Sequence, residues 1–493
     1  MVEHRDGGPR RQGRGGARPD TTPPGARQRD SRRPAAKSWR QVQPARRVAY
    51  NVLRAVQDAD AYANLLLPRE LERAGLSGGD AALATELTYG TLRRVGTYDA
   101  VIALAADREP STVDPAVLDA LRLGVHQLMA TRVASHAAVN ESVELAREAS
   151  GSGAAGFANA VLRRIARDNP GDWLTRVADT ARSDDERIGL ESSHPVWIVR
   201  ALRRALMAEG RGEELDDLLD ADNVSPRVTM AALPGLAEPD GTRTSYSPVG
   251  FRLRAGDPEP LVRASGGTVR VQDEGSQLAA LALTRLAPVA EGERWLDLCA
   301  GPGGKTALLA ADALAHGATL EANELVPARA GLVRKAIAPV PLEVEVHERD
   351  GRELADERPG TYDRILVDAP CTGLGALRRR PEARWRKQPS DVAELATVQA
   401  GLLRSAVGAL KPGGTVAYVT CSPHLAETSA IVRQIVEELG NEVEELDARA
   451  VLRRVSRGAI DLPAPESGTG HAQLWPHRHG TDAMFIALLR RTR

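Results

Sequence analysis

Hydrophobic residues recur at helical spacing through the first third of the chain. Val48, Val52 and Val56 stand four residues apart, which places them on one face of a helix. Two further stripes of this kind are formed by Leu118, Leu121, Val125 and Leu128 and by Phe157, Val161 and Ile165. Few β-branched runs interrupt the pattern, so residues 44–175 are predicted to form an all-α domain. The glycine-rich segment 149–156 is predicted to be a loop between helices.

After residue 266 the pattern changes to short apolar strands that alternate with helical stretches. Strands are predicted at 294–299, 319–324, 342–350, 362–368 and 414–422, and helices near 304–316, 327–338, 391–410 and 425–439. This alternation is typical of a parallel, doubly wound sheet, which binds ligands at the carboxyl ends of its strands. We therefore expect an α/β domain over 266–493. Residues 176–265, in which Pro, Gly and Asp break short apolar runs, are predicted to be a small α/β connecting region.

The composition of the 493 residues excludes several classes of protein. Hydrophobic residues make up 42% of the chain, enough to build real cores, so a wholly disordered protein is excluded. No apolar stretch reaches the roughly 18 residues of a membrane span, and the first residues lack the apolar core of a signal peptide. Three cysteines are too few for a disulfide scaffold and suit a reducing compartment. We therefore expect a cytoplasmic protein with no membrane span.

The net charge of −1 conceals an uneven distribution of charge. Residues 1–40 hold eleven basic and four acidic residues, a net charge of +7, and the other 453 residues hold 54 basic and 62 acidic residues, a net charge of −8. The segment 1–43 is rich in Gly, Pro and Arg and is predicted to be a disordered basic tail. It is either an arm that attracts RNA through the phosphates or a solvated extension without a role.

A glycine-rich loop follows the first predicted strand of the α/β domain. Residues 297–306 read Asp-Leu-Cys-Ala-Gly-Pro-Gly-Gly-Lys-Thr. Cys299 stands where the phosphate-binding loop of nucleoside triphosphatases needs a glycine, and Thr306 stands where a dinucleotide fingerprint needs its third glycine. The readings that remain are a nucleoside ligand without a phosphate chain, such as S-adenosylmethionine, and a glycine-rich turn without a ligand. A carboxylate at a strand end can accept ribose hydroxyls, which favours the nucleoside. Acids end the next three predicted strands: Glu324, Asp350 and Asp368.

All three cysteines stand at or just past a predicted strand of this domain: Cys299, Cys371 and Cys421. If the fourth and fifth predicted strands are neighbours, Cys371 and Cys421 open onto the same pocket. A lone cysteine is usually a small buried hydrophobe, whereas two beside a cofactor site suggest thiolate chemistry. A metal site is not expected, because no Cys-x-x-Cys pair or histidine cluster supplies a ligand set. Two thiols suit methylation of a pyrimidine at carbon 5, because one can add to carbon 6 while a second basic group assists loss of the carbon 5 proton.

Three motifs of the α/β domain together resemble those of the RNA 5-methylcytosine methyltransferases. They are the glycine loop, Asp-Ala-Pro-Cys-Thr-Gly-Leu-Gly at 368–375 and Thr-Cys-Ser at 420–422. Residues 61–64, 86–94 and 157–164 resemble a NusB-type RNA-binding domain. The pairing is similar to the RsmB (Sun/Fmu) family, whose members methylate a cytosine of small-subunit ribosomal RNA. The resemblance implies an all-α NusB-like domain followed by a Rossmann-like class I methyltransferase domain that uses S-adenosylmethionine.

The resemblance also implies a role for individual residues. Cys421 is expected to attack carbon 6, Cys371 to assist proton removal and enzyme release, and Asp368 to contact the cytosine ring and the cofactor. Residues expected to bind S-adenosylmethionine are Cys299, Ala300, Gly301, Pro302, Gly303, Gly304, Lys305, Glu324, Asp350 and Asp368. Several positions depart from the family pattern, among them Gly301, Thr372 and residues 480–485, and two further segments bear on the site. Ala-Glu-Thr-Ser at 426–429 keeps only Glu427 of an acidic stretch, and Pro-Arg-Val-Thr at 226–229 replaces Pro-Leu-Thr-Leu-Arg.

A basic run follows the Cys371 loop directly. Residues 378–387 carry six basic residues and one acidic residue. Basic side chains position RNA through its phosphates, and an aromatic ring can stack on a base. RNA contact is therefore expected from Arg378, Arg379, Arg380, Arg384, Trp385, Arg386 and Lys387. The alternative is a solvated run of charge in which Trp385 packs on the domain.

The chain is thus expected to be a monomeric enzyme that methylates carbon 5 of a cytosine in 16S ribosomal RNA, either free or in a partly assembled small subunit. Two alternatives stay open at this point. The same chemistry could act on transfer RNA or on another ribosomal RNA position, or the chain could be a non-catalytic NusB-like RNA-binding or assembly factor. Retention of both cysteines, Asp368 and the glycine loop argues against the non-catalytic alternative.

Overall fold

The computed structural model describes residues 42–493, except residues 60, 255 and 464–469. The predicted basic tail therefore lies almost wholly outside the described residues, and so does the proposed RNA-attracting arm. Within the described part of the chain, no helix is both long and apolar enough to cross a membrane.

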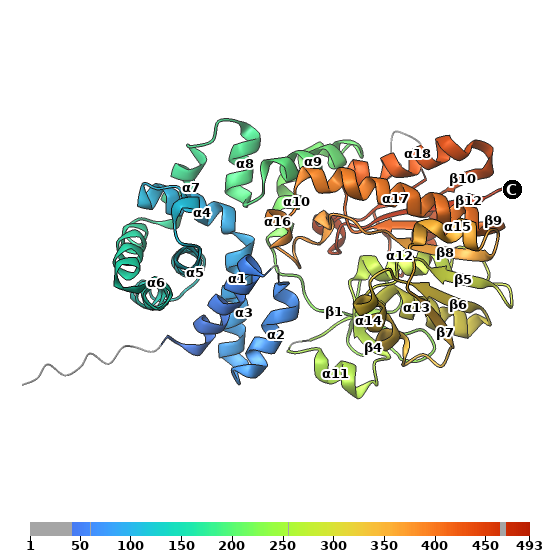
Figure 1. The fold of residues 1–493 in the computed structure, drawn as a ribbon, viewed down its shortest axis with the longest axis horizontal. Coiled ribbons are helices and arrows are strands. Elements are labelled where there is room, and N and C mark those ends of the chain that lie inside the picture. The colour runs from blue at the N-terminus through green and yellow to red at the C-terminus, as the bar shows by residue number, and fades with distance from the viewer. Residues whose placement is uncertain (1–41, 60, 255, 464–469) are drawn as a thin grey trace, which may run out of the picture. The chain divides into compact units, whose positions relative to one another are not determined.

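The chain is helical from residue 44 to residue 222 (Figure 1, blue to green). Asp114 caps α5 by accepting hydrogen bonds from the backbone N–H groups of Ala116 and Val117. The predicted apolar stripes face the core of this domain, where Val48, Val52, Val125 and Val161 are buried. The helices are α1 (Pro44–Asp58), α2 (Ala63–Arg73), α3 (Gly78–Arg93), α4 (Val95–Ala106), α5 (Pro115–Ala130), α6 (Ser135–Ile165), α7 (Pro170–Ala178), α8 (Asp184–Ser192), α9 (Val196–Met207) and α10 (Leu215–Asp222).

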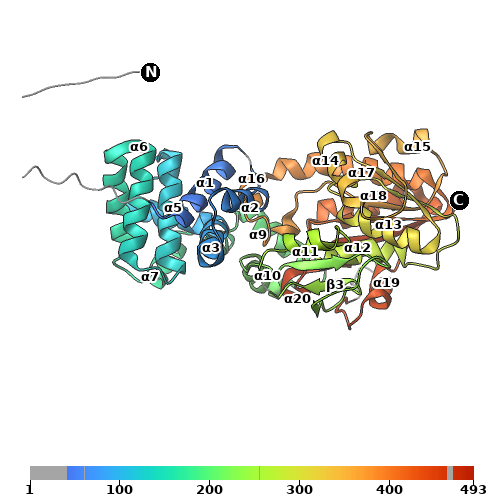
Figure 2. The ribbon, with the colours of Figure 1, turned by 90° about the horizontal axis from the view of Figure 1, so that it is seen from below.

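The predicted loop at 149–156 is wrong for most of its length. Helix α6 runs through the segment, and the backbone leaves helical geometry only at Ser150 and Gly151, where φ of Gly151 is 82°. A glycine adopts this positive φ without steric cost, so two residues suffice to kink the helix. The two parts of α6 then both pack beside α5 (Figure 2).

A small antiparallel sheet follows the last of these helices. Its strands are β1 (Thr229–Ala232), β2 (Thr242–Arg243), β3 (Gly250–Arg252) and β4 (Val269–Val271), in the order β2-β3-β1-β4. Helix α11 (Glu259–Ala264) connects β3 to β4. The boundary predicted at residue 265 therefore falls inside this unit, because β4 pairs with β1.

The remainder of the chain forms a mostly parallel sheet in the strand order β10-β12-β9-β8-β5-β6-β7. The strands are β5 (Arg294–Asp297), β6 (Thr319–Asn323), β7 (Val344–His347), β8 (Tyr362–Asp368), β9 (Leu410–Thr420), β10 (Val443–Leu446), β11 (Ala472–Gln473), which pairs with β12, and β12 (Phe485–Arg491). The chain leaves β5 toward β6 and β7, then returns to the other side of β5 to form β8 and β9. The switch point therefore lies between β5 and β8, where sheets of this type bind ligands.

Helices cover both faces of this sheet, as the alternation along β8 shows. Leu366 packs with α12 and α13, whereas Ile365 and Val367 pack with α17 and α18 on the other face. Figure 1 shows α17 and α18 together on one side of the strands. The helices of this domain are α12 (Glu274–Thr284), α13 (Gly304–His316), α14 (Pro327–Ile337), α15 (Leu354–Glu357), α16 (Ala383–Arg386), α17 (Pro389–Ala409), α18 (Ser429–Leu439), α19 (Ala448–Val455) and α20 (Pro476–His479).

Candidate active site

Two cysteines meet at the carboxyl ends of the neighbouring strands β8 and β9. The strands pair in parallel, with Asp368 opposite Val419. Cys371 follows β8 and Cys421 follows β9, and their Sγ atoms are 3.4 Å apart. Both thiols are free and half-buried. The sequence-based expectation that these two side chains share one pocket therefore agrees with the geometry.

The charges around the two thiols make them unequal. The hydrogen bond from Cys371 lowers the pKa of Cys421, and the positive charges of Lys305 and Arg380 act in the same direction against burial and Asp368. The same hydrogen bond, together with burial, raises the pKa of Cys371 well above its ordinary value. Because the thiolate is the nucleophilic form, Cys421 is the more reactive of the pair.

An ion pair lies beside the thiols. Lys305 Nζ, from the first turn of α13, is 2.8 Å from Asp368 Oδ2 at the end of β8. Burial lowers the pKa of Lys305, but the charge of Asp368 more than offsets this effect and the net shift is upward. Lys305 is therefore a cation beside the thiols, and its ion pair fixes the carboxylate of Asp368 at the carboxyl end of β8.

Glu427 connects the two cysteine loops through hydrogen bonds. This fully buried residue accepts hydrogen bonds from the Thr372 backbone N–H at 2.8 Å and from the Ser422 hydroxyl at 2.6 Å, and also from the Thr372 hydroxyl. Gln399 Nε2 donates to it at 3.2 Å. Thr372 and Ser422 each directly follow a cysteine, so Glu427 fixes their separation. The only sign of this role in the sequence is that Glu427 is the one acid retained from the acidic stretch of the family pattern.

The glycine loop has close contacts that leave little room for side chains. A Cβ at Gly301 would lie 2.3 Å from Glu324 Oε2, and Gly303 has φ of 101° and would place a Cβ 2.5 Å from Ala336. Glu324 is buried and accepts hydrogen bonds from the Gly301 and Val326 backbone N–H groups, each at 3.0 Å. The loop is thereby pressed against the end of β6, and α13 begins directly after it.

These residues fit a nucleoside cofactor of the S-adenosylmethionine type. Glu324 and Asp350 place carboxylates after the adjacent strands β6 and β7, and the loop leads into the N-terminus of α13, whose N–H groups can bind polar ligand atoms. Glu324 Oε2 accepts from Gly301 and also lies 3.5 Å from Arg329, whereas Oε1 accepts only from Val326 among the described residues and keeps a lone pair for a hydroxyl. Burial raises the pKa of Cys299 well above its ordinary value, so this thiol stays neutral, in keeping with a loop residue that has no covalent role.

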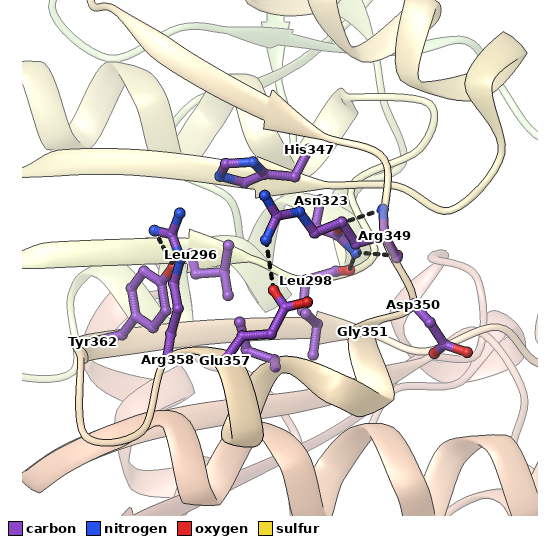
Figure 3. Close-up of a pocket in the computed structure, with 11 residues that line it drawn as sticks. Leu296, Leu298, Asn323, His347, Arg349, Asp350, Gly351, Glu357, Arg358 and Tyr362 are labelled. Carbon is purple, nitrogen blue, oxygen red and sulfur yellow. Dashed lines mark hydrogen bonds and ion pairs between the residues drawn. The ribbon is translucent and has the colours of Figure 1, made fainter.

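Asn323, which the sequence analysis missed, joins the loops that carry Cys299 and Asp350. Its side-chain amide donates to the Leu298 carbonyl at 3.1 Å and to the Arg349 carbonyl at 3.0 Å, and its oxygen accepts from the Arg349 backbone N–H. Figure 3 shows this cluster above a small pocket, with Asp350 pointing away from it. Asn323 therefore positions Asp350 relative to the glycine loop.

The basic run 378–387 is mostly engaged inside the protein. Arg378 and Arg379 form ion pairs with Asp273 and Asp482; Arg378 lies 2.9 Å from Asp273 and 2.8 Å from Asp482. A Cβ on Gly96 would lie 2.2 Å from the Trp385 ring, which is therefore packed against α4. The expectation that Arg378 and Arg379 contact RNA is not supported, because both guanidinium groups are already neutralised.

The second half of the run joins the catalytic domain to the helical domain. Arg384 is fully buried and donates to the Arg93 carbonyl at 3.2 Å and the Ser193 carbonyl at 3.0 Å. Arg386 donates to the Val56 and Ala61 carbonyls at 2.6 and 2.7 Å. RNA contact by Arg384 is therefore wrong for this structure, since the side chain has no exposed surface. Arg380 is exposed and lies over the Tyr62 ring. Trp385, Arg386 and Lys387 are half-buried, so contact with RNA stays a prediction for these three residues and for Arg380.

Asp222 makes this junction sensitive to pH. It is buried beside Arg384, neither carboxyl oxygen has a hydrogen-bond partner, and burial raises its pKa to about 7. His194 lies 3.7 Å away, but burial lowers its pKa well below the ordinary value, so it is neutral and forms no ion pair with Asp222. The folded state keeps this proton up to about pH 7, whereas an ordinary Asp loses it near 3.8. The stability contribution is therefore fully present below pH 3.8 and is lost as the pH rises to about 7.

Asp222→Asn is expected to raise the melting temperature at pH 8 relative to the unmodified protein, and to raise it less or not at all at pH 5. Each unit of pKa difference corresponds to about 1.4 kcal/mol, so the gain at pH 8 amounts to a few kcal/mol. Thermal unfolding at several pH values measures it. Asp220→Asn, at an exposed position of the same helix, is the matched control. An equal effect of Asp222→Asn at pH 5 and pH 8 would contradict the titration of this residue.

Comparison with known proteins places the two domains. Residues 283–490 match the family model described as 16S rRNA methyltransferase RsmB/F, and residues 43–167 match the NusB family. A Mycobacterium tuberculosis protein named as a methyltransferase is 50% identical over 462 residues, covering 92% of this chain and 97% of its own. The ribosomal RNA small subunit methyltransferase B of Erwinia tasmaniensis is 32% identical over 456 residues, covering 90% and 97%. The crystal structure of PH0851 is 21% identical with a TM-score of 0.75, covering 92% and 99%, and has the same fold.

These matches confirm the expected fold class, an all-α NusB-like domain followed by a Rossmann-like methyltransferase domain. They also confirm an RNA methyltransferase that takes its methyl group from S-adenosylmethionine, which rules out the non-catalytic alternative. The chain belongs to the 16S rRNA methyltransferase RsmB/F family.

Proposed function

We propose that this enzyme methylates carbon 5 of a cytosine in 16S ribosomal RNA through a covalent bond between Cys421 and carbon 6. The observation that carries the proposal is the pair of thiols 3.4 Å apart at the ends of β8 and β9, next to the Lys305–Asp368 ion pair. Two thiols of unequal pKa supply a nucleophile and a second group for its release. The name of the Erwinia tasmaniensis relative supports the choice of small-subunit ribosomal RNA.

The first step uses Cys421 as a thiolate. Its electron pair forms the bond to carbon 6, and the carbon 5–carbon 6 pair shifts so that carbon 5 becomes nucleophilic. Asp368 contacts the ring and holds a proton at nitrogen 3, which favours the addition. S-adenosylmethionine supplies the methyl group that carbon 5 accepts.

The second step releases the enzyme and uses Cys371. The causes that raise the pKa of Cys371 include its hydrogen bond to Cys421 and the charge of that residue. Both disappear once the Cys421 sulfur is bonded to carbon 6, so Cys371 then gives its proton to solvent water more readily. As a thiolate it accepts the proton of carbon 5, the ring double bond forms again, and the Cys421 sulfur leaves with its electron pair.

A second group of residues would hold the cofactor. We assign its binding to the loop Cys299–Lys305, to Glu324 and Asp350 at the ends of β6 and β7, and to Asp368. The close contacts support this assignment, because they bring the loop backbone to Glu324 after β6 at Gly301 and against helix α14 at Gly303. We also propose that the substrate is free small-subunit ribosomal RNA or a partly assembled small subunit. The enzyme would bind it as a monomer in the cytoplasm.

The proposal is tested by incubating the purified enzyme and labelled S-adenosylmethionine with 16S ribosomal RNA from cells that lack the gene. We expect stoichiometric labelling and one cytosine that becomes resistant to bisulfite. Transfer RNA and 23S ribosomal RNA form the comparison arms. Labelling confined to either of these would contradict the 16S target, and labelling without a bisulfite-resistant cytosine would contradict methylation at carbon 5.

A further inference from the structure

A groove lined by arginines lies on the small antiparallel sheet, away from the two thiols. It has a volume of about 600 Å³, within the range of about 300–1,000 Å³ typical of ligand sites. Pro226, Val228 and Leu253 supply apolar wall, and backbone pairing between Leu253 and Val228 closes its base. The polar side chains that line it are Arg227, Thr242, Arg252 and Arg254. The strand β3 that carries Arg252 is labelled in Figure 2.

The three arginines of this groove differ from those of the basic run 378–387. Arg227 and Arg254 are exposed, Arg252 is half-exposed, and none of the three guanidinium groups has a hydrogen-bond or ion-pair partner among the described residues. The lining contains no acidic residue. By contrast, Arg378 and Arg379 are neutralised by Asp273 and Asp482. The three guanidinium groups of the groove therefore form no ion pair with a described acidic residue.

The contacts at its two ends place the groove between the helical domain and the glycine loop. At one end, Ser225 accepts a hydrogen bond from Arg93 of α3 at 3.1 Å. At the other, the carbonyl of Thr229 accepts from the Gln272 backbone N–H at 3.0 Å, and the Gln272 side chain lies next to Gly304.

We propose that Arg227, Arg252 and Arg254 bind the phosphate backbone of the substrate RNA outside the pocket that takes the target cytosine. Guanidinium groups match phosphate oxygens with paired hydrogen bonds, and three of them around one groove fit successive phosphates better than a single small anion. The apolar wall can pack against ribose. The inference rests on the proposed function, because it takes the partner to be the RNA that the enzyme methylates. It also gives the unusual segment 226–229 a role, since Arg227 is part of it.

The test measures binding of a 16S ribosomal RNA fragment, one that the wild-type enzyme methylates, over a range of salt concentrations without methyl donor. The triple variant Arg227→Gln, Arg252→Gln, Arg254→Gln is expected to bind about 10-fold or more weakly near 0.1 M salt. The slope of log K against log salt is expected to fall by about 2, because each phosphate contact on single-stranded RNA contributes about 0.7. The triple lysine variant should keep the slope, since it keeps the charge.

The loss of a single charge is tested with Arg252→Gln, and Arg433→Gln is its matched control. Arg433 lies on α18, is exposed and has no partner among the described residues. Arg252→Gln is expected to lower the slope and Arg433→Gln to leave it unchanged. A wild-type slope for the triple glutamine variant would overturn the proposal, as would a loss of affinity limited to one RNA sequence and absent on a scrambled fragment. The proposed function is tested separately, by methylation of 16S RNA with the wild-type enzyme. Failure of that reaction would contradict the proposed function, whereas the binding measurement tests only the role of the three arginines.

Discussion

Cys371→Ala is expected to accumulate a covalent protein–RNA complex that survives denaturing electrophoresis, whereas Cys421→Ala should form none and lose methyl transfer by about 10⁴-fold or more. The reason is that the two thiols act at different steps of the reaction. Cys421 has the lowered pKa and makes the bond to carbon 6, and Cys371 is needed only after that bond exists. Removing the second group therefore blocks release without blocking attachment.

The measurement is a gel shift of the protein after incubation with 16S ribosomal RNA and S-adenosylmethionine. The double variant Cys371→Ala, Cys421→Ala is the control, and it should show no complex, because the attacking sulfur is missing. The rate of complex formation by Cys371→Ala should rise with pH, because the thiolate is the reactive form. A complex formed by Cys421→Ala and not by Cys371→Ala would reverse the two assignments.

The sequence predicted the elements that position this chemistry because their signals are local. Helix α13 occupies 304–316 as predicted, since a glycine loop before it and Gly317 after it mark both ends. The strands β8 and β9 carry short apolar runs, at 365–367 and 416–419, that lie just before the motifs with the cysteines. The pairing of the two strands depends on tertiary structure and has no local signal. The sequence therefore supported a shared pocket only on the assumption that β8 and β9 are neighbours.

The fate of the basic run could not be predicted in the same way. Residues 378–387 have the same composition whether they face RNA or fill an interface. What decides between the two is the position of Asp273 and Asp482, which lie more than 100 residues away in the chain. For the same reason the arginine groove escaped notice, because Arg227 and Arg252 come together only through the pairing of β1 with β3.

Glu427→Ala is expected to lower methyl transfer by about 100-fold, because a displacement of about 1 Å at reacting groups has an effect of that size. The variant leaves the Thr372 N–H and the Ser422 hydroxyl without their acceptor in a fully buried site. Each buried donor left unpaired costs about 1–3 kcal/mol, so the melting temperature should fall as well. Glu427→Gln retains one acceptor oxygen and should recover part of both losses.

A readout independent of stability separates positioning from folding. In the Cys371→Ala background, formation of the covalent complex reports only whether Cys421 reaches carbon 6, and it can be followed well below the melting temperature of every variant. Adding Glu427→Ala should slow it by about the same 100-fold, since the loops after β8 and β9 lose their common anchor. Glu437→Gln, an exposed acid of α18 without a partner among the described residues, is the matched control and should leave the rate unchanged. A normal rate of complex formation with Glu427→Ala, despite a lower melting temperature, would restrict this residue to a role in stability and place the alignment of the thiols elsewhere in their loops.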